Sequence, residues 1–429
     1  MKVVIIGGGS AGTSCAVELR KRSKEATITI FEGTEYREYS PCALPYVLAG
    51  EIPSFDDIFI FTDEDYERHA IVLKKNARVE SIDTETKTVR TATEECPYDV
   101  LIIATGSEPT IPFEIEGDYF TLRTLADAKR LEQRFKEKNT LVVVGGGLIG
   151  IETAQAALER GMSVQVIEAD DRIMRSLLDH DMERRLRRDL DIPVRTSTRI
   201  LHARQSILQL KDDTIRYDAI VIATGLTPTI RLAQDAGLNV RRGIVIDDDH
   251  KTSDPSIYAV GDCCEPPRRF EEPQPAMLGT LAFQAAPTIA RSILNEPREP
   301  RRVLGAAISR IGKTIVASSG LTHERAQHLG IDAYGAIIDA STRSGYYPGD
   351  YPISVKLVAR RDGVIIGGQI IGREDIAGRI NLITLAITHE HTLTNLERLE
   401  TVYNPASAPI HEPITVAAQT LIRKLEALR

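Results

Sequence analysis

The chain opens with Val3-Val4-Ile5-Ile6-Gly7-Gly8-Gly9-Ser10-Ala11-Gly12, an apolar run that ends in a glycine-rich turn. The same pattern returns as Leu141-Val142-Val143-Val144-Gly145-Gly146-Gly147-Leu148-Ile149-Gly150. A buried strand, a tight glycine turn and a helix that begins at the turn form the phosphate-binding part of a dinucleotide-binding βαβ unit. The sequence therefore predicts two such units in one chain.

Each unit continues into a second apolar run that ends in an acidic residue. Residues 27–31 precede Glu32, and residues 164–167 precede Glu168. An acid about 20 residues beyond the last fingerprint glycine is placed to hydrogen-bond a ribose hydroxyl. Its presence favours a dinucleotide site over the alternative, a glycine-rich turn that binds no ligand. Two further acids follow Glu168 and would repel a 2′-phosphate, so we expect NADH to be preferred over NADPH.

A longer sequence segment is also duplicated along the chain. Residues 98–106 (YDVLIIATG) recur as residues 217–225 (YDAIVIATG), and each predicts a buried parallel strand that ends in a tight turn. Residues 257–262 (IYAVGD) predict another strand, and we expect Gly261-Asp262 to open a helix and to present a carboxylate to a ribitol hydroxyl. We expect this segment to return to the first sheet, which makes the first domain discontinuous.

Composition restricts the class of protein. A chain of 429 residues needs two or three domains, and a net charge of −8 argues against a nucleic-acid binder. No apolar stretch has the length of a membrane span, and the N-terminal strand lacks the features of a signal peptide. These features predict a cytoplasmic protein.

The five cysteines show no disulfide framework and no CxxC pair. Cys42 stands in Tyr39-Ser40-Pro41-Cys42-Ala43-Leu44-Pro45-Tyr46, where two prolines fix the backbone that presents its sulfur. Cys15 falls on the first predicted helix, and Cys263 and Cys264 are adjacent, so we expect these three to be packing residues. A packing role is also the alternative for Cys42.

From about residue 302 the chain carries no dinucleotide fingerprint and predicts an α+β domain. The expected strands are residues 303–309, 314–318, 353–358 and 364–370. The expected helices are residues 321–329, 376–388 and 414–428. His389-Glu390-His391 lacks a third ligand, so we predict no metal site.

In this order, the motifs resemble the pyridine nucleotide-disulfide oxidoreductases. The resemblance covers essentially the whole chain and is greatest to the single-cysteine branch, which includes coenzyme A disulfide reductases, NADH oxidases, NADH peroxidases and persulfide reductases. Besides the fingerprints and Cys42, it rests on Tyr346-Tyr347-Pro348-Gly349 and Tyr403-Asn404-Pro405. It implies an α/β fold with two Rossmann-like domains and a C-terminal α+β dimerisation domain. The implied domains are an FAD-binding domain at 1–112 and 246–300, an inserted NAD(P)H-binding domain at 113–245, and an interface domain at 301–429.

The resemblance also implies FAD and NADH as cofactors, coenzyme A as a candidate bound substrate, and a homodimer with shared active sites, without nucleic-acid or membrane partners. It implies catalytic roles for Cys42, Tyr347 and Tyr403. The implied cofactor-binding residues of the first unit are Gly7, Gly9, Ser10, Ala11, Gly12, Glu32, Cys42, Val79, Ala104, Thr105, Gly106, Gly261, Asp262 and Thr280. Those of the second unit are Gly145, Gly147, Leu148, Ile149, Gly150, Glu168 and Gly225. The substrate candidates are Ser14, Glu18, Lys21, Arg22, Glu38, Pro41, His69, Tyr346 and His411.

Four residues depart from the family pattern. Ser10 stands where the peroxidases and oxidases carry histidine, which disfavours peroxide and oxygen-to-water chemistry. Glu38 replaces a frequent serine, Pro41 replaces the asparagine of coenzyme A disulfide reductases, and Leu148 replaces a gating tyrosine.

Basic residues near both fingerprints leave alternatives open. Arg20, Lys21, Arg22 and Arg68 are compatible with coenzyme A phosphates, and a solvated basic face is the alternative. After the second fingerprint, two arginines at positions 172 and 175 keep NADPH open as a donor.

The leading interpretation is an FAD- and NADH-dependent enzyme that reduces coenzyme A disulfide, coenzyme A persulfide or polysulfide through Cys42. One alternative is an NADH oxidase. Another is a reductase of a ferredoxin- or rubredoxin-type protein in which Cys42 is incidental. A third is a flavoprotein subunit that docks on other proteins.

Overall fold

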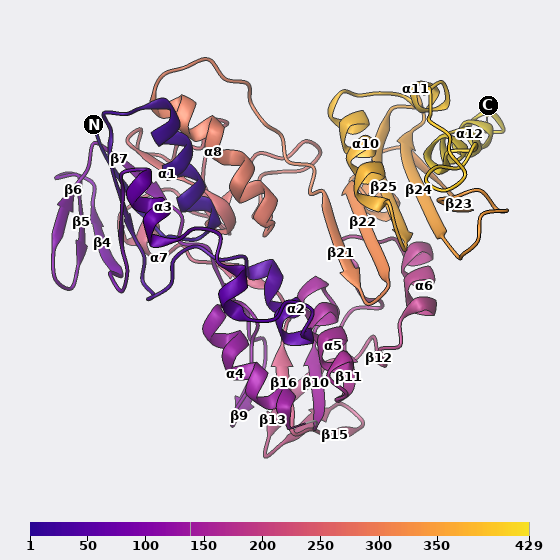
Figure 1. Cartoon of the computed structure of the whole chain (residues 1–429), viewed down its shortest axis with the longest axis horizontal. Helices are drawn as coiled ribbons and strands as arrows, with labels where there is room; N and C mark the ends of the chain where they lie inside the picture. Colours follow the sequence, from indigo (N-terminus) through magenta and orange to yellow (C-terminus); the bar gives the residue numbers. More distant parts are fainter. Residues whose placement is uncertain (138, 429) are drawn as a thin grey trace. The chain divides into compact units, whose positions relative to one another are not determined.

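The computed structural model describes residues 1–137 and 139–428, and its contacts divide the chain into two compact units. Figure 1 labels their helices and strands along the chain. The first unit comprises Met1–Pro112, Phe120–Lys136 and Thr224–Val303, and the second comprises Phe113–Tyr119, Glu137–Ala223 and Leu304–Arg429. Within the described residues, no helix has both the length and the apolar character needed to cross a bilayer.

A five-stranded parallel sheet forms the centre of the first unit. Its strand order is β19-β7-β1-β2-β3, with bounds Ile257–Ala259, Val100–Ile103, Lys2–Ile6, Thr27–Phe31 and Ile71–Lys74. The central strands are β-branched and buried on both faces, as expected for a parallel sheet. Because β19 pairs with β7, the prediction that the late segment returns to the first sheet is confirmed.

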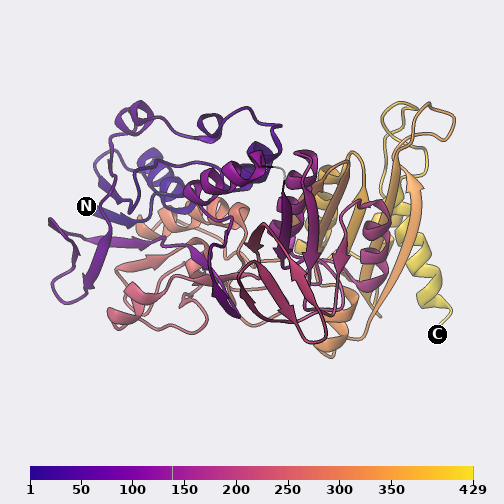
Figure 2. The same ribbon diagram turned by 90° about the horizontal axis from the view of Figure 1, so that it is seen from below.

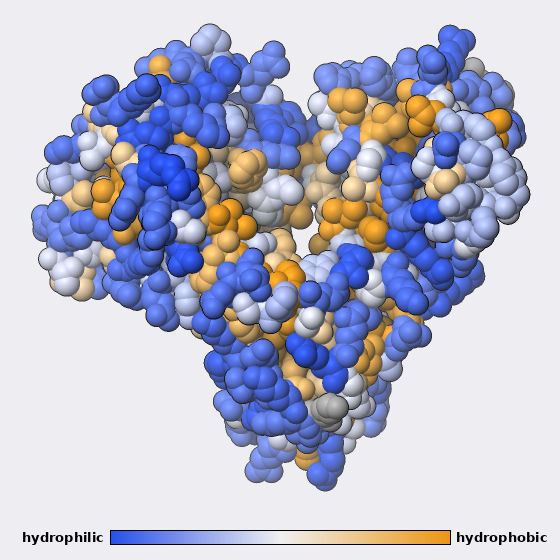
Figure 3. All heavy atoms as spheres, viewed as in Figure 1, coloured by the Kyte–Doolittle hydropathy of each residue, from blue (hydrophilic) through white to orange (hydrophobic). Residues whose placement is uncertain are grey.

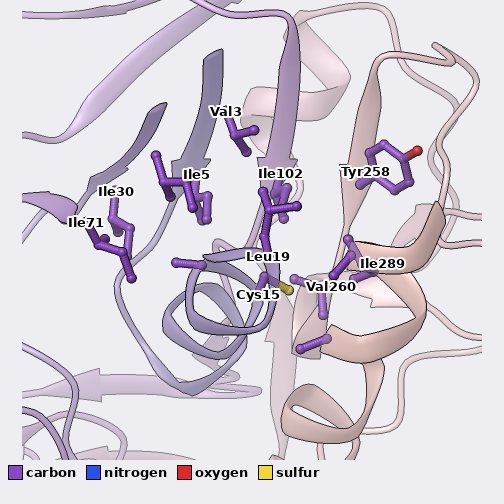
Figure 4. Close-up of a cluster of buried hydrophobic side chains, with 14 of the residues drawn as sticks. Val3, Ile5, Cys15, Leu19, Ile30, Ile71, Ile102, Tyr258, Val260 and Ile289 are labelled. Carbon is purple, nitrogen blue, oxygen red and sulfur yellow. The ribbon is translucent and has the colours of Figure 1, made fainter. Parts of the chain in front are cut away.

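Two helices cover one face of this sheet, α1 (Ser10–Arg22) and α8 (Gly279–Ile293). Figure 4 shows the cluster that they bury, with Cys15 and Leu19 from α1 and Ile289 from α8 directed at the strands. Burying a side chain such as Leu19 stabilises the unit by roughly 1.5–3 kcal/mol. Cys15 is buried here, which confirms its packing role.

The opposite face of the sheet packs against an antiparallel meander, β4 (Val79–Asp83), β5 (Thr88–Thr91) and β6 (Glu95–Pro97). Shorter elements complete the unit: η1 (Pro41–Ala43), α2 (Leu44–Ala49), η2 (Phe55–Ile58), α3 (Asp63–Arg68), β8 (Ser107–Pro109), α4 (Leu125–Lys136), β17 (Leu226–Pro228), α7 (Arg231–Asp235), β18 (Ile244–Val245), η3 (Gly261–Cys263) and β20 (Cys264–Glu265).

The predicted helix at Gly261-Asp262 is wrong. The chain makes one turn of 3-10 helix, η3, and then pairs β20 with β18. Pro266 and Pro267 follow and cannot donate the backbone hydrogen bonds that a helix needs. The next helix, α8, therefore begins only at Gly279.

Two segments predicted to belong to the NAD(P)H-binding domain, residues 120–136 and 224–245, belong to the first unit. The second Ala-Thr-Gly turn leads into β17, which pairs antiparallel with β8 after the first Ala-Thr-Gly turn. At the start of α4, the Leu125 N–H donates to the Tyr39 hydroxyl at 3.0 Å. These backbone contacts hold both segments in the first unit.

The second unit repeats the strand, turn and helix of the first fingerprint. Its parallel sheet has the order β12-β11-β10-β16, with bounds Val194–Arg195, Ser163–Ile167, Thr140–Val144 and Ala219–Ile222. The helices are α5 (Leu148–Glu159) and α6 (His180–Asp189). A second sheet has the order β15-β14-β13-β9, with bounds Thr214–Arg216, Ile207–Leu210, Ile200–Arg204 and Glu114–Glu116.

The C-terminal part of the second unit is the expected α+β domain. Its antiparallel sheet has the order β21-β22-β25-β24-β23, with bounds Ala307–Ile311, Thr314–Gly320, Ile365–Gly372, Pro352–Arg360 and Ala333–Ser341. The helices are α9 (His323–His328), α10 (Ile376–Thr388), α11 (Leu393–Glu397) and α12 (Pro413–Glu426). Figure 2 shows α12, in yellow, beside this sheet. Hydrophobic atoms reach the surface near α10 and α11 (Figure 3).

Candidate functional site

The first fingerprint has the geometry of a phosphate-binding turn. Gly7 has φ +108°, and a Cβ there would lie 2.2 Å from the Ala104 carbonyl oxygen. A Cβ at Gly12 would lie 2.0 Å from the Gly7 oxygen, whereas one at Gly9 would meet nothing within 4 Å. The start of α1 therefore borders open space, and helix N-termini attract anions. These residues fit a dinucleotide pyrophosphate.

Glu32 is oriented beside this turn by donors on both of its carboxylate oxygens. The Gly8 N–H donates to Oε2 at 2.8 Å. The Thr34 N–H and hydroxyl both donate to Oε1, each at 2.8 Å. The acid thus lies at the carboxyl end of β2, where a ribose is expected to bind.

The second fingerprint repeats these contacts. Gly145 has φ +108°, a Cβ at Gly150 would lie 2.0 Å from the Gly145 oxygen, and one at Gly147 would meet nothing within 4 Å. The Gly146 N–H donates to Glu168 Oε2 at 2.5 Å. The predicted duplication is therefore present at the level of individual hydrogen bonds, and Leu148 and Ile149 begin α5 at this turn.

Both arginines that follow Glu168 are paired with acids. Arg172 is 5% exposed and contacts Asp171 and Glu324. Arg175 Nη1 lies 2.9 Å from Asp170 Oδ1. Their charges are thus neutralised, and the acidic character of this loop favours a ribose without a 2′-phosphate.

Cys42 lies in the single turn η1, which continues directly into α2, and its side chain is exposed. A Cβ at Gly279 would lie 3.9 Å from the Cys42 sulfur, so the N-terminus of α8 adjoins the thiol. A helix N-terminus favours a thiolate over a thiol. The five cysteines, all within the described residues, form no disulfide.

The start of α1 adjoins the same turn of α8. Gly261 has φ +80°, and a Cβ there would lie 3.1 Å from the Ala11 Cβ and 3.7 Å from the Ala282 Cβ. Asp262 Oδ2 accepts hydrogen bonds from Ser107 Oγ and Arg123 Nη2, both at 3.0 Å. Sequence reasoning missed Ser107 and Arg123, because neither belongs to a motif.

Glu38 is a buried acid beside the first fingerprint. It is 6% exposed, and its carboxyl is hydrogen-bonded to the Ser10 side chain. Burial raises the pKa of Glu38 to about 7, while the hydrogen bond from Ser10 acts in the opposite direction. The sequence signal was the replacement of a small polar residue by an acid four residues before Cys42.

The tyrosines of the C-terminal domain do not form one cluster. Tyr346 and Tyr403 are exposed, and their hydroxyls are hydrogen-bonded to each other. This hydrogen bond lowers the pKa of Tyr346 and raises that of Tyr403. Tyr347 is half-buried, with the Arg343 guanidinium 5.5 Å from its ring centre. Tyr346, predicted to contact substrate, therefore pairs with Tyr403, predicted to be catalytic.

Most basic side chains at the end of α1 already make hydrogen bonds or ion pairs within the protein. Arg20 donates to the backbone oxygens of Ser23, Lys24, Ala26 and Ala70. Arg22 contacts Glu18 at 3.0 Å and Glu296 at 2.8 Å, and Arg68 contacts Asp65 at 2.9 Å. Lys21 is 63% exposed. Of these cations, Arg20 has a clear structural role, whereas Lys21 makes an exposed ion pair with Glu18 at 3.5 Å.

The remaining candidates have varied environments. Val79 is buried in the core, while the Thr105 hydroxyl donates to the Thr229 carbonyl at 2.7 Å. His69 Nδ1 lies 2.7 Å from the Asp65 carbonyl oxygen. Gly106 and Gly225 have positive φ angles. Ser14 and Pro41 are half-buried, and Thr280 and His411 are exposed. Within the described residues, no group of side chains is suited to hold a metal ion.

Comparison with known proteins gives the family. The sequence profile of the pyridine nucleotide-disulphide oxidoreductases matches residues 1–282, and that of their dimerisation domain matches residues 311–412. The chain is 33% identical to an NADH oxidase of Methanocaldococcus jannaschii, with 99% of each chain covered. It is 31% identical to an NAD(P)H coenzyme A polysulfide/persulfide reductase of Pyrococcus horikoshii, with 98% of each covered.

A solved structure gives the same answer. The fold matches that of an NAD-dependent persulfide reductase from A. fulgidus with a TM-score of 0.94 and 29% identity, over 100% of this chain and 84% of that one. The family uses FAD and NAD(P)H, which agrees with the two fingerprint turns described above. The chain is therefore a member of the pyridine nucleotide-disulphide oxidoreductase family, with a C-terminal dimerisation domain.

Proposed function

We propose that this enzyme uses NADH to reduce coenzyme A disulfide, coenzyme A persulfide or polysulfide through Cys42. The observation that carries the proposal is the exposed Cys42 sulfur beside Gly279, at the start of a helix in the unit that holds the first fingerprint. The activity in the name of the Pyrococcus horikoshii relative, a coenzyme A polysulfide/persulfide reductase, supports the choice of substrate.

Bound FAD supplies the chemistry that passes an electron pair from NADH toward sulfur. The role of Cys42 follows from its surroundings. Its thiolate, favoured by the start of α8, attacks one sulfur of the substrate disulfide, forms a mixed disulfide and releases one thiolate. Two electrons from NADH then cleave the mixed disulfide, and protonation gives the second thiol as Cys42 returns to the thiolate.

The site is proposed to be completed by a second copy of the chain. The dimerisation-domain match supports a homodimer, as do the exposed apolar residues Leu385, Val402 and Ile410 in the same domain. In the proposed dimer, the Tyr346–Tyr403 pair of one subunit approaches Cys42 of the other and supplies a proton to the leaving thiol. The presence of five unbridged thiols supports the proposed cytoplasmic location.

The roles of the individual units are part of this proposal. We assign FAD to the unit that contains residues 1–112 and 246–300, NAD(P)H to the second-unit part of residues 113–245, and the subunit interface to residues 301–429. The acids near Glu168 support NADH as the preferred donor.

The test is the variant Cys42→Ser, compared with Cys96→Ser, in which a half-buried thiol of the same unit is changed. We expect C42S to lose reduction of coenzyme A disulfide by a factor of about 10³ or more while NADH still bleaches the flavin absorbance. C96S should behave as wild type. Full disulfide turnover by C42S would refute the proposal. Mass analysis of the peptide that holds Cys42 then identifies a coenzyme A or single-sulfur adduct.

An NADH oxidase is the second candidate, because the Methanocaldococcus jannaschii relative carries that name. Ser10 argues against it, since no imidazole is available at this position to assist oxygen or peroxide reduction. Oxygen consumption with NADH alone should be slow compared with disulfide reduction. A faster oxygen reaction, with water as product, would favour the oxidase.

A further inference from the structure

The Glu38 carboxyl lies at the start of the helix that carries the first fingerprint. It is hydrogen-bonded to Ser10, the first residue of α1, and the residue is 6% exposed. Backbone contacts fix its position: the Ile60 N–H donates to the Glu38 carbonyl at 3.0 Å, and the Glu38 N–H donates to the Tyr66 hydroxyl at 3.4 Å. The backbone that carries the buried carboxyl is therefore held in place on both sides.

The elements around Glu38 bring no cation to it. From α1 the neutral Ser10 side chain hydrogen-bonds the carboxyl, and from α3 the phenol of Tyr66 accepts the Glu38 N–H. Among the described residues, no ion pair involves Glu38. Its charge would therefore be unpaired.

Nearby cations are occupied elsewhere. The adjacent Arg37 donates to the Phe61 carbonyl at 2.6 Å and stacks on the Phe59 ring at 4.4 Å. Lys75 pairs with Asp63 at 3.0 Å. An ionised Glu38 would thus be a buried charge compensated mainly by the Ser10 hydroxyl and the N-terminus of α1.

That N-terminus is also where the pyrophosphate of FAD is expected to bind, because Gly9 borders open space there. Two groups would then compete for one patch of positive potential. Anions that share a buried site raise each other's proton affinity, and of the two the carboxyl is the weaker acid. The repulsion between the two anions is removed at the lowest cost in free energy if the Glu38 carboxyl takes up a proton from solvent.

We propose that FAD binding at the first fingerprint is coupled to protonation of Glu38, so that the carboxyl is neutral when the cofactor is bound and ionises when the cofactor leaves. The step is a proton uptake from water and forms no covalent bond. Burial already raises the pKa of Glu38 to about 7, so both forms are accessible near neutral pH. Negative phosphates beside it shift the same equilibrium further toward the acid.

The experiment measures FAD retention by the full-length holoenzyme. The protein is diluted to low concentration between pH 6 and pH 9, and the released FAD is measured by fluorescence. We expect the affinity to fall by up to about tenfold per pH unit above pH 7, because one proton is lost with the cofactor. Glu38→Gln, which keeps the shape of the side chain but cannot ionise, should abolish this slope.

The matched control is Glu35→Gln, which removes an exposed carboxylate from the same loop and should keep the wild-type slope. The slope is measured without a disulfide substrate, so this inference depends on the cofactor and not on the proposed substrate. A slope that persists in E38Q, or a wild-type protein without a slope, would overturn the proposal. If E38Q does not fold, a pH indicator provides the readout in the wild type, where about one proton should be released per FAD lost at pH 8.

Discussion

Arg123 Nη2 lies 3.0 Å from Asp262 Oδ2, and Arg123 Nε donates to the Ser107 carbonyl at 3.2 Å. One guanidinium thus joins the segment before α4 to η3 and to β8. Asp262 is the residue expected to bind the ribitol of FAD, so we expect Arg123, which belongs to no fingerprint, to hold this carboxylate in position.

Removing this guanidinium should therefore affect both stability and cofactor retention. For Arg123→Met we expect a loss of about 1–3 kcal/mol in the free energy of unfolding, because the partly buried Asp262 loses its cation. FAD should also dissociate faster. Denaturant unfolding and flavin fluorescence measure the two effects. Arg90→Met, which breaks an exposed pair with Glu95, is the control and should cost under about 1 kcal/mol.

Lys356 and Asp179 form a buried ion pair in the second unit, with Nζ 2.8 Å from Oδ2 and both side chains at most 3% exposed. For Lys356→Met we expect a loss of about 3–5 kcal/mol at pH 7, because Asp179 is left as a buried charge. Arg185→Met, at the more exposed pair with Asp339, should cost about 1 kcal/mol or less.

The effect of Lys356→Met should depend on pH in a defined direction. Burial alone would raise the pKa of Asp179, but the charge of Lys356, together with hydrogen bonds from the Glu324 N–H, Lys356 and Gln369, outweighs it and lowers the pKa below 3.8. A lowered pKa means that stability is present above the unfolded value and is lost as pH falls. The gap between wild type and K356M should thus be widest near neutrality and shrink below about pH 4. A gap that widens in acid would contradict this account.

Nucleotide preference should change when the acids near the second fingerprint are removed. In a Glu168→Gln/Asp170→Asn double variant, we expect the ratio of kcat/KM for NADH over NADPH to fall by about tenfold, because repulsion of the 2′-phosphate weakens. Arg172→Met should leave the ratio unchanged, since Arg172 contacts Asp171 and Glu324. A selective loss of NADPH activity in R172M would instead show that Arg172 binds the phosphate.

The proposed sharing of sites between subunits can be tested by complementation. Cys42→Ser and the double variant Tyr346→Phe/Tyr403→Phe should each be impaired alone. After mixing and subunit exchange, heterodimers would contain one intact site, so activity should recover to about a quarter of wild type. Recovery should follow the time course of exchange measured by mass spectrometry. No recovery in fully exchanged protein would mean that each site is built from one subunit.

Local sequence patterns predicted the regular elements well. Residues 376–388 were predicted as a helix and form α10 with the same bounds. The strand at residues 333–341 was missed, because Gly335 and several alanines give it no clear alternation of apolar and polar residues. The predicted helix after Asp262 failed although Pro266 and Pro267 were a visible stop signal.

The pairing of β19 with the first sheet was predicted, but the side-chain environments that distant segments create at the site were not. The family resemblance implied a catalytic role for Cys42, but its neighbour Gly279 lies in a helix that no motif marks. Glu38 attracted attention as a departure from the family, yet its burial against Ser10 depends on how α1, α3 and the intervening loop pack. Such environments are set by tertiary structure, which a local pattern does not encode.

The end of α1 carries a practical warning for mutagenesis. Arg20 ties the last turn of this helix to four backbone carbonyls, including that of Ala70 just before β3, whereas the neighbouring, exposed Lys21 pairs with Glu18 at 3.5 Å. Alanine scanning of these adjacent cations for an anionic ligand would mix two different losses. Weaker ligand binding by an Arg20 variant would reflect the loss of hydrogen bonds that hold the backbone. Weaker binding by a Lys21 variant would instead reflect lost contact with the ligand.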